Sequence, residues 1–132
     1  MKKKILIFED EWNTIRGSFE LANIYAFEEN LQFIVKPRSQ DINFCSWKVE
    51  YDAVFVDITL AKNTQLDGFN IIRKIINECL FDTSKVVILT GNSKVEEKLK
   101  EMDINNSEIT IMYKPIDFDT LSKTLSKIIG NE

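Results

Sequence analysis

Five polar residues each come where an apolar stretch of the sequence ends: Glu9, Asp10, Asp57, Thr90 and Lys114. Taken singly, each fits a structural role. Acids after strands often cap the next helix, a Thr before a Gly commonly makes a turn, and a lone Lys is usually a solvated surface charge. Taken together, three carboxylates, a hydroxyl and an ammonium form a set of groups that can do chemistry.

The chemistry that suits this set is metal-assisted phosphoryl transfer. Three carboxylates at one place repel one another, which disfavours their ionised forms unless a cation neutralises them. An all-oxygen donor set without His or Cys suits a hard divalent ion, and we expect Mg²⁺ with several waters retained. Thr90 and Lys114 offer the hydroxyl and the ammonium that a transferred phosphoryl group needs around its equatorial oxygens.

Composition excludes several other classes of function. The chain has 132 residues, enough for one domain with a useful core, and no His, which removes Ser-His-Asp catalysis, His-ligated zinc and phosphohistidine donors. A net charge of −4 argues against direct nucleic-acid binding. No run is long enough to span a membrane or to form a signal peptide, so we expect a cytoplasmic protein. Cys45 and Cys79 are interpreted as reduced, buried thiols.

The elements that must position the five polar residues alternate along the chain. Apolar runs predict strands at 5–8, 31–35, 53–56, 86–89 and 109–112. Helical spacing predicts four helices with the following inner faces: Ile15, Phe19, Ala22 and Ala26; Phe69, Ile72, Ile76 and Cys79; Val95, Leu99 and Met102; Phe118, Leu121, Leu125 and Ile128.

Helix boundaries are predicted from capping residues. Asp67 and Asp117 are expected N-caps, Ser93 to Glu96 matches a capping box, and a short helix is expected at 42–47. The order βαβαβαβαβα is typical of an α/β domain with a parallel sheet covered by helices on both faces, here one domain over residues 1–132. In such a sheet the carboxyl ends of the strands share one edge, so the five polar residues should converge.

The whole chain resembles the receiver domain of bacterial two-component response regulators. Five segments carry the resemblance: Ile5 to Glu11 with its paired acids, Ala53 to Asp57, the Asp67-Gly68 pair, Ile88 to Gly91, and Lys114-Pro115. The resemblance implies a flavodoxin-like, doubly wound sheet of five parallel strands in the order 2-1-3-4-5. It also implies a cis peptide bond between Lys114 and Pro115.

The resemblance implies a role for each site residue. Glu9, Asp10, Asp57 and the backbone carbonyl of Thr59 would hold Mg²⁺. Asp57 would accept a phosphoryl group, Lys114 would pair with a phosphate oxygen, and Thr90 would move to hydrogen-bond another. The partners implied are a sensor histidine kinase or histidine phosphotransfer protein and a downstream protein target or separate output domain, with homodimer formation on activation as a further outcome.

Three features depart from the family pattern. Glu9 stands where Asp is more frequent, which gives a longer arm to the same ion. The loop at 58–67 is about three residues longer than the family norm. Ile111 replaces the aromatic residue that commonly turns inward on activation, so we expect a switch carried mainly by Thr90 and the loop after it.

The leading hypothesis is therefore a phosphoacceptor receiver that catalyses only its own phosphorylation and dephosphorylation, and is not otherwise an enzyme. It would switch a partner-binding surface made by the fourth helix, the fifth strand and the fifth helix. A degenerate receiver that acts without phosphorylation is one alternative. A small Mg²⁺-dependent phosphohydrolase is another, although Thr59 stands where such an enzyme would want a second acid. No output domain follows the last helix, which fits a stand-alone or an excised receiver.

Overall fold

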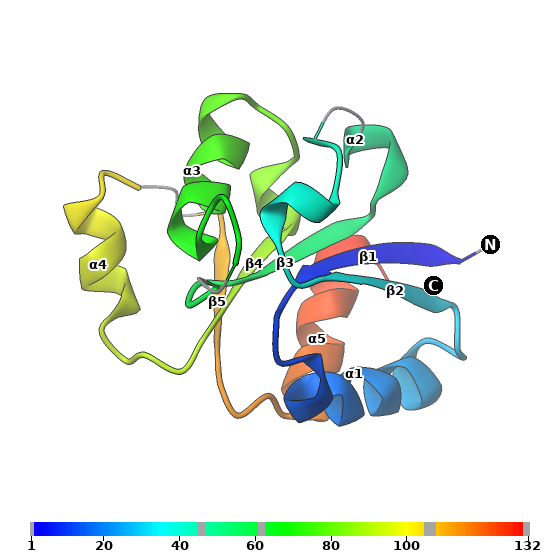
Figure 1. Ribbon diagram of the computed structural model, residues 1–132. Helices are drawn as coiled ribbons and strands as arrows, with labels where there is room; N and C mark the ends of the chain where they lie inside the picture. Colours follow the sequence, from blue (N-terminus) through cyan, green and yellow to red (C-terminus); the bar gives the residue numbers. More distant parts are fainter. Residues whose placement is uncertain (1, 45–46, 61–62, 105–107, 131–132) are drawn as a thin grey trace.

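The computed structural model describes residues 2–44, 47–60, 63–104 and 108–130 (Figure 1). Its sheet has five strands, all parallel, in the order β2-β1-β3-β4-β5, which confirms the predicted fold class. The strands are β1 (Lys3–Phe8), β2 (Leu31–Lys36), β3 (Ala53–Asp57), β4 (Val86–Thr90) and β5 (Thr110–Tyr113). Because the strands are parallel, their carboxyl ends lie along one edge of the sheet.

Helices cover both faces of the sheet (Figure 1). One face carries α1 (Trp12–Ala26) and α5 (Phe118–Ile129), and the other carries α2 (Trp47–Glu50), α3 (Gly68–Asn77) and α4 (Val95–Glu101). Short 3₁₀ turns, η1 (Ser39–Asp41) and η3 (Thr83–Lys85), follow β2 and precede β4. Among the described residues, no helix has both the length and the apolar character needed to cross a membrane.

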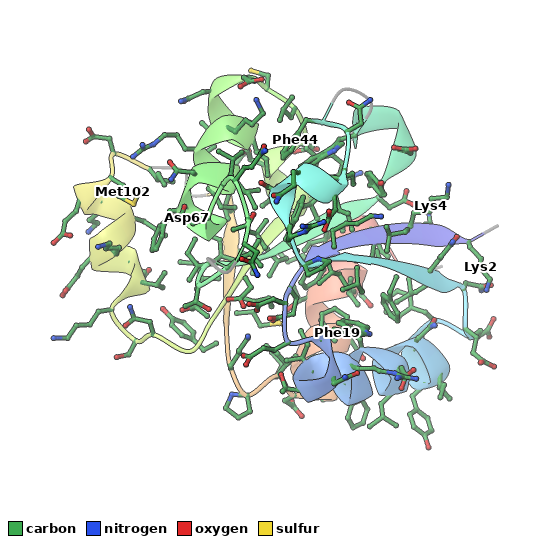
Figure 2. The ribbon with its side chains drawn as sticks, viewed as in Figure 1. Lys2, Lys4, Phe19, Phe44, Asp67 and Met102 are labelled. Atoms are coloured by element: carbon green, nitrogen blue, oxygen red, sulfur yellow. The ribbon has the colours of Figure 1, made fainter. Side chains whose placement is uncertain are left out.

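The core has two layers because alternate strand residues point to opposite faces of the sheet. Along β3, Phe55 packs towards α1 and α5, whereas Val54 and Val56 pack towards the other three helices. Phe19 and Phe44 mark the two layers on opposite sides of the sheet (Figure 2). A central strand buried on both faces must be apolar throughout, which is why it appears in the sequence as an uninterrupted run.

The predicted inner face of α3 is partly wrong. Its buried residues are Gly68, Ile71, Ile72 and Ile75, whereas Phe69 and Ile76 are half-buried. The helix ends at Asn77, and Cys79 follows in the left-handed region with φ of 50°. There Cys79 N–H donates to the Ile76 carbonyl and Leu80 N–H to the Ile75 carbonyl, the bonding of a Schellman turn. Cys79 is therefore exposed rather than buried, and Cys45 lies outside the described residues.

Three other local predictions are also wrong. The helix expected at 42–47 is α2, which begins at Trp47. The predicted N-cap Ser93 is not the N-cap of α4, which has Lys94 in that place and no side-chain cap. Ahead of it, the Asn92 side chain accepts the N–H of Lys94 at 2.9 Å. Phe118, the first residue of α5, is 37% exposed, and its ring lies beside that of the exposed Tyr25 on α1, with the ring centroids 6.0 Å apart. The other three residues of the predicted α5 face are buried, and Asp67 and Asp117 are N-caps as expected.

Candidate functional site

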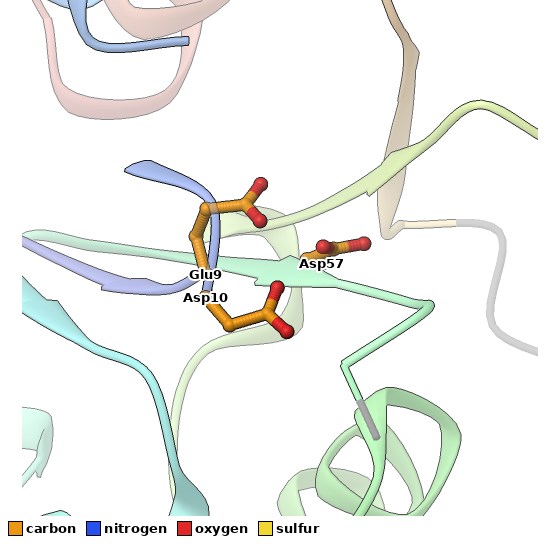
Figure 3. Close-up of side chains that lie close together, drawn as sticks. All are labelled: Glu9, Asp10 and Asp57. Atoms are coloured by element: carbon orange, nitrogen blue, oxygen red, sulfur yellow. The ribbon is translucent and has the colours of Figure 1, made fainter. Parts of the chain in front are cut away.

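The carboxylates of Glu9, Asp10 and Asp57 gather at the carboxyl edge of the sheet and point towards a common space (Figure 3). Glu9 and Asp10 directly follow β1, and Asp57 is the last residue of β3. The pairing of Phe8 with Val56 sets these two strand ends side by side. One oxygen from each carboxylate lies within 4.8 Å of the others. Glu9 and Asp57 are buried, whereas Asp10 is accessible to solvent.

Lys114 enters the same site from the end of β5. Its backbone N–H donates to the carbonyl of Thr90 at 2.7 Å, which continues the pairing of β5 with β4. Its ammonium Nζ lies 2.9 Å from Glu9 Oε1 and 3.5 Å from Asp57 Oδ2. The Lys114-Pro115 peptide bond is cis, as the resemblance implied. The ammonium thus contacts two of the three clustered carboxylates.

Thr90 ends the strand next to β3 and is fully buried. The neighbouring residue Leu89 pairs with Asp57 in the sheet, so Thr90 lies one step beyond the aspartate along the same edge. Its hydroxyl accepts a hydrogen bond from the backbone N–H of Asn92 at 2.9 Å. The structure therefore brings Thr90 to the site edge, with its hydroxyl engaged by the chain that leads into α4.

Thr59 contributes more to the site than the sequence indicated. Only its backbone carbonyl was expected to take part, but both its backbone N–H and its hydroxyl donate to Asp57 Oδ1, at 3.0 and 2.7 Å. Aspartate side chains commonly accept the N–H two residues further on, and this preference was the available signal. One oxygen of Asp57 is therefore held by two donors, while the other faces Lys114.

The long loop between β3 and α3 is tied to η1 by side-chain hydrogen bonds. Ser39 N–H donates to Thr64 Oγ1 at 2.8 Å, and Leu66 N–H donates to Ser39 Oγ at 2.9 Å. The side chain of Gln40 accepts the N–H of Gln65, also at 2.9 Å. Since η1 follows β2 and the loop follows β3, these bonds join segments on either side of β1. They hold residues 64–66 of the loop against η1, and nothing in the sequence pattern signalled them.

Gly68 allows α3 to pass directly against the backbone next to Asp57. A Cβ at this position would lie 2.3 Å from the Asp57 carbonyl oxygen and 2.5 Å from Ile58 Cα. We expect Gly68→Ala to push α3 away from β3 and to lower the free energy of unfolding by about 3 kcal/mol. Gly17→Ala is the matched control, because a Cβ there meets nothing within 4 Å. Equal unfolding free energies for the two variants, measured with denaturant, would contradict this account.

Burial and charge act together on the ionisation of the site. Burial raises the pKa of Glu9 to about 7, with help from Asp57 and against the opposing effect of Lys114. Burial lowers the pKa of Lys114, but its contacts with Glu9 and Asp57 outweigh that effect and leave the pKa above its ordinary value. Lys114 therefore stays charged at neutral pH, whereas Glu9 titrates there.

Stability should depend on pH through Glu9. A carboxyl group whose pKa is higher in the folded than in the unfolded protein stabilises the fold at low pH, and this contribution is lost as pH rises through the folded value. Without added metal, we expect the free energy of unfolding to fall between about pH 4.5 and pH 7, by on the order of 2–3 kcal/mol. Glu9→Gln should flatten this slope in denaturant titrations at several pH values. An unchanged slope in the variant would assign the pH dependence to other groups.

The donor set fits a hard divalent cation. Three carboxylates against one ammonium leave two negative charges uncompensated when all are ionised. All the acidic ligands offer oxygen, and the solvent-accessible Asp10 leaves room for retained waters, which is the coordination that Mg²⁺ prefers. A bound cation would also stabilise the ionised form of Glu9, whose pKa burial raises.

Neither a known family profile nor a curated protein sequence matches this chain. Solved structures of receiver domains, in contrast, match nearly its whole length. The Francisella response regulator 1452 receiver domain is 16% identical and covers 97% of each chain, with a TM-score of 0.66. The Vibrio cholerae chemotaxis protein CheY4 is 15% identical and covers 97% of this chain and 99% of its own, with a TM-score of 0.63.

A third structure is the receiver domain of the sensor histidine kinase PA1611 from Pseudomonas aeruginosa PAO1. It is 19% identical and covers 98% of this chain and 99% of its own, with a TM-score of 0.70. That protein was solved with a magnesium ion coordinated in its active-site cleft. At these identities the likeness establishes the fold, which is that of response-regulator receiver domains.

Proposed function

We propose that this chain is a phosphoacceptor receiver in which Asp57 takes a phosphoryl group from a phosphohistidine on a partner protein. The observation that carries the proposal is the position of Asp57. It is buried at the carboxyl edge of a receiver-type sheet, clustered with Glu9 and Asp10 and 3.5 Å from the ammonium of Lys114. The partner would be a sensor histidine kinase or a histidine phosphotransfer protein.

The reaction is a nucleophilic displacement at phosphorus. An oxygen of Asp57 attacks the phosphoryl group, the P–N bond to the histidine breaks, and the imidazole leaves with the bonding electrons. Lys114 pairs with one phosphoryl oxygen, and the hydroxyl of Thr90 donates to another once it leaves Asn92. The aspartyl phosphate formed is later hydrolysed, so the chain catalyses its own phosphorylation and dephosphorylation and acts on no separate substrate.

Mg²⁺ would be held by the carboxylates of Glu9, Asp10 and Asp57 together with the backbone carbonyl of Thr59. When bound, the ion supplies charge neutralisation for the phosphoryl oxygens. The carboxylate cluster of this chain and the magnesium ion coordinated in the active-site cleft of the PA1611 receiver domain support this assignment.

Two other functions are less well supported. A free-standing phosphohydrolase would need a second acid two residues after Asp57. That residue is Thr59, whose hydroxyl donates to Asp57 instead. A receiver that acts without phosphorylation would not need Glu9, Asp10 and Lys114 to converge on Asp57.

The proposal is tested by incubating the protein with acetyl phosphate and Mg²⁺ and measuring its intact mass. We expect the mass of one added phosphoryl group, which disappears on chelation of the metal before addition of the donor. Steady release of phosphate from p-nitrophenyl phosphate with no protein adduct would instead favour the phosphohydrolase. No adduct and no turnover would favour the phosphorylation-independent receiver.

The contacts of Thr90 suggest how phosphorylation reaches the partner surface. Its hydroxyl accepts the Asn92 N–H, and the Asn92 side chain in turn accepts the N–H of Lys94, the residue that precedes α4. A Thr90 hydroxyl drawn to a phosphate would give up this contact and release the start of α4. The surface of α4, β5 and α5 is therefore the proposed binding surface for a downstream protein, a separate output domain or a second copy of the chain.

The change in packing during the switch should be modest. Ile111 lines an apolar cavity of about 30 Å³ together with Ile88 and Leu99. A space of that size holds roughly one water molecule and has no room for an aromatic ring. We therefore expect phosphorylation to change the conformation of residues 90–95 more than that of the Ile111 side chain on β5.

Amide hydrogen exchange with and without beryllofluoride tests this route. Beryllofluoride forms a stable mimic of the aspartyl phosphate, so we expect faster exchange at residues 91–95 and a smaller effect around Ile111. Changes confined to the residues next to Glu9 and Asp57 would count against the Thr90 route.

We also propose, from the receiver fold and the absence of a spanning helix among the described residues, that the protein acts in the cytoplasm.

A further inference from the structure

We propose that Glu9 is the positioning residue for Lys114 and that this ion pair competes with metal binding, because one carboxylate serves both cations. The inference deepens the proposed phosphoacceptor function and rests on it. It assigns a specific consequence to the presence of Glu at position 9.

The ammonium of Lys114 is held more closely by Glu9 than by the phosphoacceptor. Its distance to Glu9 Oε1 is 2.9 Å, a normal hydrogen bond, whereas its distance to Asp57 Oδ2 is 3.5 Å, at the limit of one. The Glu9 side chain is completely buried, and 22% of the Lys114 side chain is exposed. Glu9 therefore fixes where the ammonium sits relative to Asp57.

The length of the Glu9 side chain makes this contact available. While Oε1 accepts from Lys114, Oε2 accepts the backbone N–H of Glu11 at 3.1 Å. The two hydrogen bonds orient the carboxylate from both sides. An Asp at this position is shorter by one methylene, so we expect it to lose or lengthen the Lys114 contact while it keeps the backbone contact.

Glu9 also belongs to the carboxylate cluster that fits a divalent cation. A second cation close to Glu9 and Asp57 reduces the negative charge that they offer to Lys114, and the burial of both carboxylates strengthens this effect. The coupling is reciprocal: the free energy by which metal binding weakens the Glu9–Lys114 ion pair equals the free energy by which that ion pair weakens metal binding. With Glu9 holding the ion, the ammonium of Lys114 would be free to turn towards Asp57 and its phosphoryl group.

A double-mutant cycle measures this competition without any phosphoryl donor. The proteins are the wild type, Glu9→Asp, Lys114→Met and the double variant, and Mg²⁺ affinity is measured by NMR titration of backbone amides at about pH 8. Lys114→Met removes a repelling cation and should tighten Mg²⁺ binding in both backgrounds. We expect Lys114→Met to increase Mg²⁺ affinity by a factor that is at least about threefold greater with Glu9 than with Asp at this position.

Two further variants guard the interpretation. Glu11→Asp shortens a neighbouring exposed acid by the same methylene and should leave the effect of Lys114→Met unchanged. Glu9→Gln keeps the length of the side chain and replaces Glu9→Asp in the experiment if that variant is poorly folded. The NMR signal of the Lys114 ammonium is then the direct readout. That signal should shift with Mg²⁺ in the wild type and much less in Glu9→Gln.

The outcomes separate this inference from the proposed function. Equal tightening by Lys114→Met in both backgrounds, with normal phosphorylation of the wild type, would overturn the Glu9 assignment alone. A wild-type protein that binds no Mg²⁺ and accepts no phosphoryl group would overturn both.

Discussion

Asp57→Asn should abolish the phosphoryl adduct that the wild-type protein forms with acetyl phosphate and Mg²⁺. The amide oxygen of Asn is a far weaker nucleophile than a carboxylate, and no other carboxylate in the described residues ends a central strand beside both Lys114 and Thr90. Intact mass spectrometry over a time course measures the effect. The fold should remain, because the substitution removes one of three mutually repelling charges.

Asp52→Asn is the matched control for this variant. Asp52 lies at the opposite end of the same strand, where its side chain accepts the N–H of Lys4 at 2.8 Å, and an Asn side chain can accept that bond as well. This control should be phosphorylated like the wild type. Adduct formation by Asp57→Asn at the wild-type rate would show that phosphorylation occurs at another residue.

Asp10→Ala should lose both Mg²⁺ binding and phosphorylation while keeping the fold. Asp10 is the solvent-accessible carboxylate of the cluster, so its removal leaves no buried group without a partner. Loss of even an outer-shell partner commonly lowers metal affinity about 10–100-fold, so loss of a direct ligand should cost at least tenfold. The free energy of unfolding should stay the same or rise, because repulsion with Glu9 and Asp57 is relieved.

Glu11→Ala controls for a nearby loss of negative charge. Glu11 is exposed, follows Asp10 directly and lies outside the cluster, so this variant should bind Mg²⁺ and accept phosphate nearly normally. Calorimetry for the metal and intact mass for the adduct are the measurements. An Asp10→Ala protein that is phosphorylated normally without metal would contradict the carboxylate-site account.

The clustering of the site residues could be predicted because it depends on strand ends alone. Glu9, Asp57 and Lys114 come directly after apolar runs that clearly predict strands, and parallel pairing brings the ends of such strands to one edge. What the strand pattern could not provide is which oxygen contacts which donor. The hydrogen bonds from Thr59 to Asp57 and from Lys114 to Glu9 depend on side-chain conformations that no spacing encodes.

The local errors have a common physical origin in the ends of helices. Cys79 continues the helical spacing of α3, but the chain leaves the helix after Asn77 through a left-handed turn without the usual Gly. At the start of α4, the N-cap is Lys94 rather than the Ser93 of the predicted capping box, and the Asn92 side chain accepts the N–H of Lys94. Periodicity identifies which helices exist, but it does not determine where their hydrogen bonding stops.

The position of the aspartyl phosphate tests the central claim most directly. The wild-type protein is treated with acetyl phosphate and Mg²⁺, reduced with borohydride, digested and mapped by mass spectrometry. Reduction of an acyl phosphate leaves homoserine, so the account predicts homoserine in place of Asp57 and every other acid unchanged. Homoserine at another position, or an unmodified Asp57 in protein that carries the phosphoryl mass, would contradict it.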